Sequence, residues 1–317
     1  MKIIKSFINF IINIFKWFFL GLYTVITLIP RYLINGIICI VDPKKGKSVT
    51  YKGKPVIPII MIGLSLTTYL ICVFITSRWY VQKLKIEYLA NDILKSTEII
   101  EQEEEEEIII EENYIPEIKD KYENIKFMSK NFSELLHINN ETVGWLTVNN
   151  TKVDYSVVQH KNNDFYLKHD FYKNRNANGW IFADYRSDFR YFGTNSIIYG
   201  HNLINKQLFG SLSWTLKESW YKKEENQYIK LSTPDSNTIW RIFSIYTTKP
   251  ETYYLKTYFQ TEQEHLSFLN TLEKRSFYDF ENDELNNNTK ILTLSTCTDY
   301  GSKRMVIHAY MVKAEYR

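Results

Sequence analysis

The sequence is poor in cysteine and nearly balanced in charge. Its 317 residues include three cysteines, Cys39, Cys72 and Cys297, which cannot form a disulfide framework. No CxxC pair or His/Cys ladder has the spacing of metal ligands, so we expect no bound metal and no cofactor. The formal net charge of +3, from 39 basic and 36 acidic residues, gives no sign of a strongly charged partner. We therefore expect no nucleic-acid partner.

A long uncharged run near the N-terminus predicts a membrane anchor. Residues 55–77 carry no charge, over a length close to the roughly 20 residues that cross the hydrocarbon core as a helix. Five lysines lie between residues 44 and 54 on one flank, and the other flank has fewer basic residues. The positive-inside bias then leaves the lysine loop in the cytoplasm and everything after Arg78 outside. Residues 1–78 are therefore assigned to a membrane anchor region.

A second apolar stretch, residues 17–41, is a potential additional membrane segment. Its part from Trp17 to Pro30 is short for a span, so it either lies in the cytoplasmic interface or crosses with help from its flanks. A cleaved signal peptide is the competing interpretation. The late position of the long apolar run and the lack of a small-residue cleavage site count against it.

Residues 79–125 are predicted to form a charged stalk or linker. The segment EQEEEEEIIIEEN at residues 101–113 is too acidic for a core and has no turn chemistry. We favour a solvated helix or a flexible spacer that holds the following domain away from the bilayer. The remaining residues, 126–317, are long enough for one globular domain with its own core.

The C-terminal domain is predicted to be mostly β. Short runs rich in β-branched and aromatic residues alternate with Asn, Asp and Gly, which is typical of strands and turns. Helical spacing interrupts this pattern at residues 127–138 and 259–275, and a short helix is expected near residues 208–214. These features together predict a closed or nearly closed β-barrel of about eight strands with peripheral helices.

Cys297 is the candidate nucleophile. It lies near the end of the predicted strand TKILTLSTCT, where alternation places Thr293, Ser295 and Cys297 on one face. The next strand, KRMVIHAYMV, begins with Arg304, and antiparallel pairing of the two strands would bring its guanidinium beside the thiol. Because a free thiol is mostly protonated at neutral pH, nucleophilic attack also needs a base or cation nearby.

Two histidines on predicted strands are candidates for that base. His201 ends the apolar run SIIYGHN, where Gly200 allows a close approach of the backbone. His308 lies in the middle of its strand, a position that fits a core histidine or a surface histidine equally well. Strand ends carry chemistry more often than strand middles, which favours His201. From these residues alone, the sequence indicates an extracytoplasmic β-rich domain with a candidate cysteine nucleophile.

The motifs around these residues resemble the sortases. The resemblance rests on TNSIIYGHN at residues 194–202, on TLSTCT much later in the chain, and on the arginine that opens the last strand. The segments ETVGWLTVNNTKVDYSVVQ, FYLKHDFYKN, NGWIFADYR and RMVIHAYMV are similar to class B, as is a helix-bearing insertion at residues 253–288. The similarity covers residues 126–317. It implies a sortase-type β-barrel and a membrane-bound cysteine transpeptidase whose catalytic domain lies outside the cell.

The resemblance also implies roles for the site residues. Cys297 would attack the peptide carbonyl of a sorting signal and hold the acyl group as a thioester. His201 would protonate the leaving amine and then deprotonate the incoming one, and Arg304 would bind the substrate or the oxyanion. Sortase relatives also have a noncatalytic histidine at the place of His308. The neighbours expected to support the site or bind substrate are Thr296, Ser295, Asp299 and Asn202.

The same resemblance implies the partners. They are surface proteins with a C-terminal sorting signal, and an amine of the peptidoglycan cross-bridge or of a pilin. The loop between Cys297 and Arg304 is short compared with many class B members, so signal preference cannot be transferred. Two other functions stay open: a hydrolytic cysteine peptidase, which would yield only a free acid, and an inactive anchored module that binds peptide without a reactive thiol.

Overall fold

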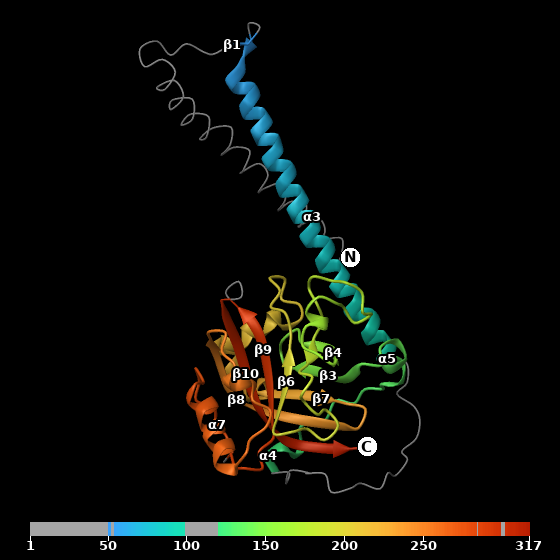
Figure 1. Ribbon diagram of the computed structural model, residues 1–317, viewed down its shortest axis with the longest axis vertical. Coiled ribbons are helices and arrows are strands. Elements are labelled where there is room, and N and C mark those ends of the chain that lie inside the picture. Colours follow the sequence, from blue (N-terminus) through green and yellow to red (C-terminus); the bar gives the residue numbers. More distant parts are fainter. Residues whose placement is uncertain (1–49, 52–53, 99–119, 284, 299–301) are drawn as a thin grey trace. The chain divides into compact units, whose positions relative to one another are not determined.

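The computed structural model describes residues 50–51, 54–98, 120–283, 285–298 and 302–317 (Figure 1). The chain divides into two compact units, Met1–Gln82 and Lys83–Arg317. The second unit contains the predicted catalytic domain. The potential membrane segment at residues 17–41 and the acidic run at residues 101–113 lie outside the described residues.

The first unit holds a short hairpin and the first part of a long helix. Strand β1 (Thr50–Tyr51) pairs with β2 (Lys54–Pro55), and helix α3 (Val56–Glu98) follows directly. The helix includes residues 56–77 of the apolar run predicted as a membrane span. Large apolar side chains are exposed along it, among them Leu70 and Phe74. Among the residues that the structure describes, no helix is both long enough and apolar enough to cross a membrane.

The second unit is built on the predicted closed barrel. Its eight strands follow the order β10-β8-β7-β3-β4-β5-β6-β9, and the pairing of β9 with β10 closes the ring. All neighbours are antiparallel except the pairs β4–β5 and β6–β9. The strands are β3 (Thr142–Val148), β4 (Asp154–Val158), β5 (Phe182–Ala183), β6 (Asn195–Tyr199), β7 (Tyr228–Ser232), β8 (Ser236–Thr248), β9 (Ile291–Thr298) and β10 (Lys303–Tyr316).

Helices and single turns of helix connect the strands. All the helical regions expected from the sequence are present, at residues 133–138, 209–216 and 262–274. The described elements are α4 (Asp120–Glu123), α5 (Ser133–Ile138), η1 (Phe165–Leu167), η2 (Phe209–Leu216), α6 (Glu218–Tyr221), η3 (Glu224–Asn226), η4 (Tyr253–Leu255) and α7 (Glu262–Lys274).

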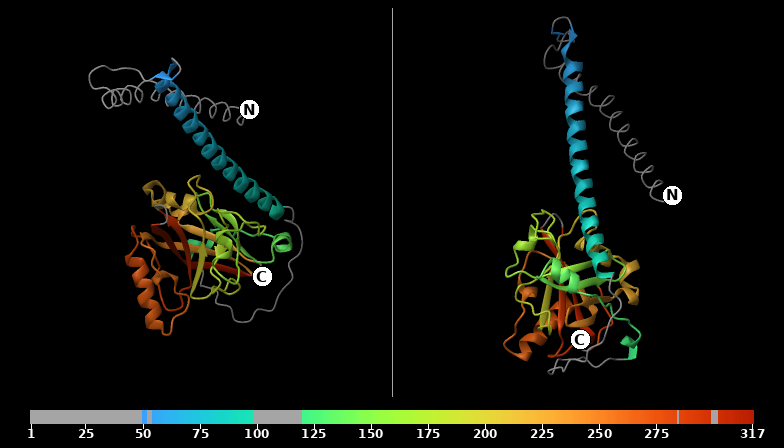
Figure 2. Two further views of the ribbon diagram at one scale, coloured as in Figure 1. Left: turned by 45° about the horizontal axis from the view of Figure 1, so that its top comes forward. Right: turned by 90° about the vertical axis from the view of Figure 1, so that its right-hand side faces the viewer.

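Helix α7 begins at a capping box and covers the outside of the barrel. The Thr261 hydroxyl accepts a hydrogen bond from the Glu264 backbone N–H, and the Glu264 carboxylate accepts one from the Gln260 N–H. Its buried face, which includes Leu269 and Leu272, packs against β8. Figure 2 shows α7 in orange on the outer side of the sheet from two further directions.

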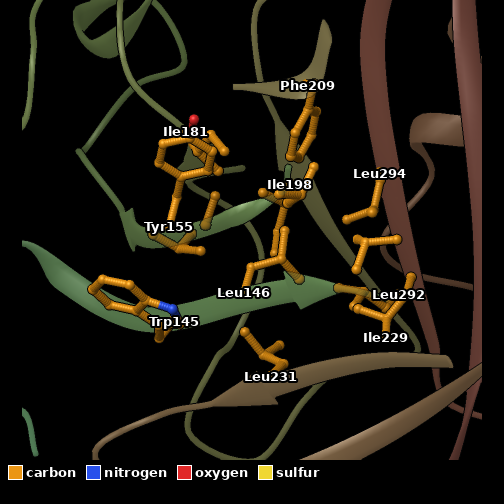
Figure 3. Packing of buried hydrophobic residues seen from close by; sticks show 14 of the residues in the cluster. Trp145, Leu146, Tyr155, Ile181, Ile198, Phe209, Ile229, Leu231, Leu292 and Leu294 are labelled. Carbon is orange, nitrogen blue, oxygen red and sulfur yellow. The ribbon is translucent and has the colours of Figure 1, made fainter. Parts of the chain in front are cut away.

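Two apolar clusters lie on opposite faces of the sheet. The larger fills the barrel interior, where Leu146, Ile198, Leu292 and Leu294 are fully buried (Figure 3). The smaller lies between the sheet and α7. Strand β10 confirms the predicted alternation. Its residues Met305, Ile307, Ala309 and Met311 belong to the interior cluster, and its residues Val306, Tyr310 and Val312 belong to the outer one.

The last turns of α3 pack against the barrel within the second unit. Ile86, Leu89 and Ile93 are buried and belong to the larger apolar cluster. The Tyr172 hydroxyl donates to Asp92 at 2.6 Å, which adds a polar contact. Residues 79–125 are predicted to form a stalk, and that prediction does not include this contact. The boundary of the catalytic domain at residue 126 stays a prediction.

Candidate active site

The site is positioned by three neighbouring strands, β6, β9 and β10. Strands β6 and β9 run parallel, with Tyr199 paired to Ser295, so both strands end at the same edge of the barrel. His201 follows β6 by two residues, and Cys297 follows Ser295 by two. Strand β10 returns antiparallel, and its Arg304 is paired with Cys297 across the ladder. The fold therefore brings together the positions of all three residues predicted to act in catalysis.

A pocket of about 350 Å³ opens at this edge. His201 and Arg304 both line it, and so do Ser295 and Thr296, which directly precede Cys297. The side chain of Cys297 and the whole of Asp299 lie outside the described residues, so their predicted roles stay predictions. The other walls come from Phe182 of β5 and from three segments, represented by Asn163 and Leu167, by Tyr199 and Gly200, and by Pro250 and Leu255.

The ring of His201 is held by a backbone carbonyl. Its Nε2 lies 3.0 Å from the carbonyl oxygen of Leu167, which can only accept a hydrogen bond. Nε2 therefore carries the proton, and the neutral ring presents Nδ1 as its acceptor. In this tautomer Nδ1 is the ring nitrogen that can accept a proton.

Two glycines make room for this arrangement. Gly179 has φ +58, and a Cβ there would lie 2.4 Å from the Tyr166 carbonyl oxygen and 3.0 Å from Cδ2 of His201. At Gly200, a Cβ would lie 2.6 Å from the ring of Phe209. The sequence analysis expected a close approach at Gly200. The structure shows that a buried phenylalanine ring makes it.

Ser295 and Thr296, both predicted to support the site, lie in the pocket wall. The Ser295 hydroxyl is 3.1 Å from the hydroxyl of Tyr254, another wall residue. Asn202 makes an isolated β-bridge with Leu208 and is not among the described residues that line the pocket. Its predicted supporting role stays a prediction.

His308 lies in the core and not in the pocket. It is fully buried, with its ring between the hydroxyls of Tyr246 and Thr293, each at 2.9 Å. Burial lowers its pKa to about 3, so the ring is neutral. Thr293 also donates to Asn195, at 2.7 Å. These contacts agree with the choice of His201 over His308 as the candidate base.

Several wall residues were not found from the sequence. Leu167 offers only a backbone carbonyl, which no sequence pattern reveals. Tyr199 stands in the quoted motif TNSIIYGHN, and no sequence pattern marks Tyr254 or Leu255 as wall residues. Gly179 stands in the quoted segment NGWIFADYR, and its glycine was the one available signal of a special backbone conformation.

The arrangement suits acyl transfer. An imidazole with a fixed tautomer can move a proton, and a guanidinium beside the cysteine position can stabilise an oxyanion. A fixed cation in a partly enclosed pocket acts more strongly than it would in water. Cys297 lies on β9, and His201 follows the end of the parallel strand β6, so the pairing of the two strands sets the backbone positions of both residues.

Comparisons with known proteins agree with this geometry. The sequence model of the sortase domain matches residues 146–312. Sortase B of Listeria monocytogenes is 34% identical over 183 residues, which are 56% of this chain and 73% of that protein. The crystal structure of sortase B from B. anthracis in complex with AAEK2 has a TM-score of 0.53 and 36% identity, covering 57% of this chain and 82% of that one. The Staphylococcus aureus sortase B–substrate complex has a TM-score of 0.54 and 31% identity, covering 57% and 84%.

Proposed function

Because this chain belongs to class B of the sortase family, whose members are cysteine transpeptidases, we propose that it joins surface proteins to an amine acceptor outside the cell. Its substrate would be a C-terminal sorting signal, and the acceptor an amine of the peptidoglycan cross-bridge or of a pilin. The observation that carries the proposal is the placement of His201 and Arg304 in one pocket, with Cys297 paired to Arg304 on the adjacent strand.

The first half of the reaction forms a thioester. The Cys297 thiolate attacks the carbonyl carbon of the sorting signal, and the negative charge moves to the carbonyl oxygen, where Arg304 stabilises it. The C–N bond then breaks. Protonated His201 gives its Nδ1 proton to the leaving amine, and Leu167 keeps the ring in place through Nε2.

The second half transfers the acyl group. The incoming amine attacks the thioester carbon and loses a proton to Nδ1 of neutral His201. The C–S bond breaks, so a new amide forms and the Cys297 thiolate returns. Over the two halves one amide bond is broken and one is formed, with no net oxidation.

We also propose that the chain is anchored in the cell membrane by residues 55–77, with the barrel outside. The uncharged run, the five lysines before it and the exposed apolar side chains of α3 support this orientation. Added protease should digest the barrel of intact cells stripped of their wall. Protection of the barrel in those cells would contradict the orientation.

The test of the proposed activity uses the full chain in detergent micelles with fluorogenic sorting-signal peptides and triglycine. We expect a ligated product of the mass of acyl peptide plus triglycine, and no ligation with Cys297→Ala. Equal ligation by Cys297→Ala would overturn the assignment of the nucleophile. Free acid as the only product, even at high triglycine concentration, would instead identify a hydrolase.

A further inference from the structure

Asp184 is a fully buried carboxylate behind the pocket, and the proposed reaction does not use it. It follows β5 directly, and its side chain has no exposed surface. Its carboxylate accepts five hydrogen bonds, from the Arg186 backbone and guanidinium, from Asn163 and from Tyr199. A buried charge with this many donors is well compensated.

The donors come from separate walls of the pocket. Nδ2 of Asn163 lies 3.0 Å from Oδ2 of Asp184, and the hydroxyl of Tyr199 lies 2.8 Å from the same oxygen. Asn163 stands in the segment before η1, and Tyr199 ends β6 two residues before His201. Both residues line the pocket.

Arg186 extends the contact to the third wall. Its Nε and Nη2 each lie 2.8 Å from an oxygen of Asp184, in a bidentate pair. The same Nη2 donates to the carbonyl oxygen of Leu255 at 3.1 Å. Leu255 ends η4 and also lines the pocket.

The charge state of the cluster is consistent with this arrangement. Burial alone would raise the pKa of Asp184, but the hydrogen bonds from Arg186 and Tyr199 more than offset it and leave the pKa below its ordinary value. Burial and the adjacent carboxylate raise the pKa of Tyr199, which stays a hydroxyl donor. The carboxylate is therefore charged and accepting at neutral pH.

We propose that Asp184 is a positioning residue that holds three walls of the pocket in register and thereby sets the affinity for the sorting signal. The described hydrogen bonds of Asp184 do not include His201, so its effect is expected on binding more than on proton transfer. This inference rests on the proposed function for its substrate. Its structural part, the coupling of the three walls, stands apart from that function.

The chain offers a matched control in Asp170. Its side chain is also fully buried, and it accepts a hydrogen bond from the Asn174 backbone and pairs with Lys85 at 3.6 Å. None of these partners lines the pocket. Asp170→Asn therefore removes a buried carboxylate of equal exposure without touching a pocket wall.

The first measurement is hydrogen exchange of the full chain by mass spectrometry. Asp184→Asn should speed exchange at residues 159–167 and 250–256 together, by about tenfold, because one substitution weakens several charge-assisted hydrogen bonds. Asp170→Asn should leave residues 250–256 as protected as in the parent. Unchanged protection of both segments in Asp184→Asn would overturn the proposal.

The second measurement is the affinity of a fluorescent sorting-signal peptide, with every variant built on Cys297→Ala so that no turnover occurs. Asp184→Asn should raise the Kd about tenfold, with Asp170→Asn within twofold of the parent. In the active protein the same change should appear in KM, with kcat altered less than threefold. Equal effects of both substitutions on Kd, or an effect confined to kcat, would overturn the assignment.

Two further outcomes stay decisive. If Asp184→Asn fails to fold, Arg186→Gln removes the link to Leu255 at a half-exposed residue, and a Kd within twofold of the parent would then overturn the proposal. If the parent ligates no peptide, the proposed function fails, and the exchange measurement still decides whether Asp184 couples the three walls.

Discussion

Cys297 and Arg304 are paired across the antiparallel strands β9 and β10. Residues directly opposite in an antiparallel ladder share a face, so their side chains leave the sheet on the same side. The pair is closed by a connection of six residues, and Arg304 lines the pocket. Arg304 is therefore the residue of β10 that stands directly opposite Cys297.

Arg304→Lys should lower kcat by about 10²–10³. Lysine keeps the charge but loses the planar fork that binds an oxyanion or carbonyl in two places. The measurement is steady-state ligation of a sorting peptide to triglycine. Lys303→Ala, at the exposed neighbouring position, is the matched control and should stay within twofold of the parent. Full activity of Arg304→Lys would show that the planar guanidinium group is not required for ligation.

Gly179→Ala should reduce both stability and activity. The added Cβ meets the carbonyl oxygens of Tyr166 and Leu167 and Cδ2 of His201, and the backbone has positive φ. We expect a loss of about 1–3 kcal/mol in the free energy of unfolding and a lower kcat, because the His201 ring is displaced from Leu167. Urea unfolding and ligation rates measure the two effects.

The control for that change is Gly193→Ala. A Cβ at Gly193 meets no atom within 4 Å, so stability and kcat should match those of the parent. A Gly179→Ala variant with parental kcat would show that ligation does not depend on the space that Gly179 leaves for the His201 ring.

Folding stability should fall as the solution is acidified below about pH 6.5. Burial lowers the pKa of His308 to about 3, so the unfolded chain binds a proton that the folded protein does not. Its contribution is therefore complete above about pH 6.5 and decreases by at most about 1.4 kcal/mol per pH unit below it. Burial also lowers the pKa of His265, which adds in the same direction.

His308→Gln should weaken this pH dependence. Urea unfolding at pH 7.5 and pH 5.0 gives the slope for the parent and the variant, and the exposed His137→Gln serves as control. The same slope in the parent and in His308→Gln would mean that His308 is not the group responsible.

The contact of α3 with the barrel should contribute measurably to stability. Ile93 is 1% exposed in that contact, and Ile93→Ala should cost about 2–5 kcal/mol in the free energy of unfolding. Leu84→Ala, at a residue of the same helix that is 46% exposed, should change it by at most about 0.5 kcal/mol. Tryptophan fluorescence during urea unfolding of the full chain in detergent measures both. If Ile93→Ala lowered the free energy of unfolding no more than Leu84→Ala does, the contact of the helix would not stabilise the barrel.

The catalytic strands were predictable because their signals are local. The alternation of Met305, Ile307 and Ala309 with Val306 and Tyr310 fixes which residues face the interior. The short connection after TLSTCT then fixes the pairing of β9 with β10. The parallel neighbour β6 was not placed beside β9 from local signals, and only the resemblance to sortases brought His201 to the same site.

The pocket walls depend on contacts that no local pattern contains. Asp184 stands in a short polar segment, and its donors Asn163 and Tyr199 come from other parts of the chain. The packing of α3 is a different case. Ile86, Leu89 and Ile93 have the spacing of one helical face. The sequence therefore contains a signal for this contact, within the segment predicted to be a solvated stalk.

The closure of the barrel by β9 and β10 has a consequence for biosynthesis. Cys297 and Arg304 lie in the final two strands, and His201 follows β6, whose parallel neighbour β9 is made much later. A nascent polypeptide therefore has no assembled pocket until its last strands have been made. Until then the chain holds only part of the set of residues on which the proposed transfer depends.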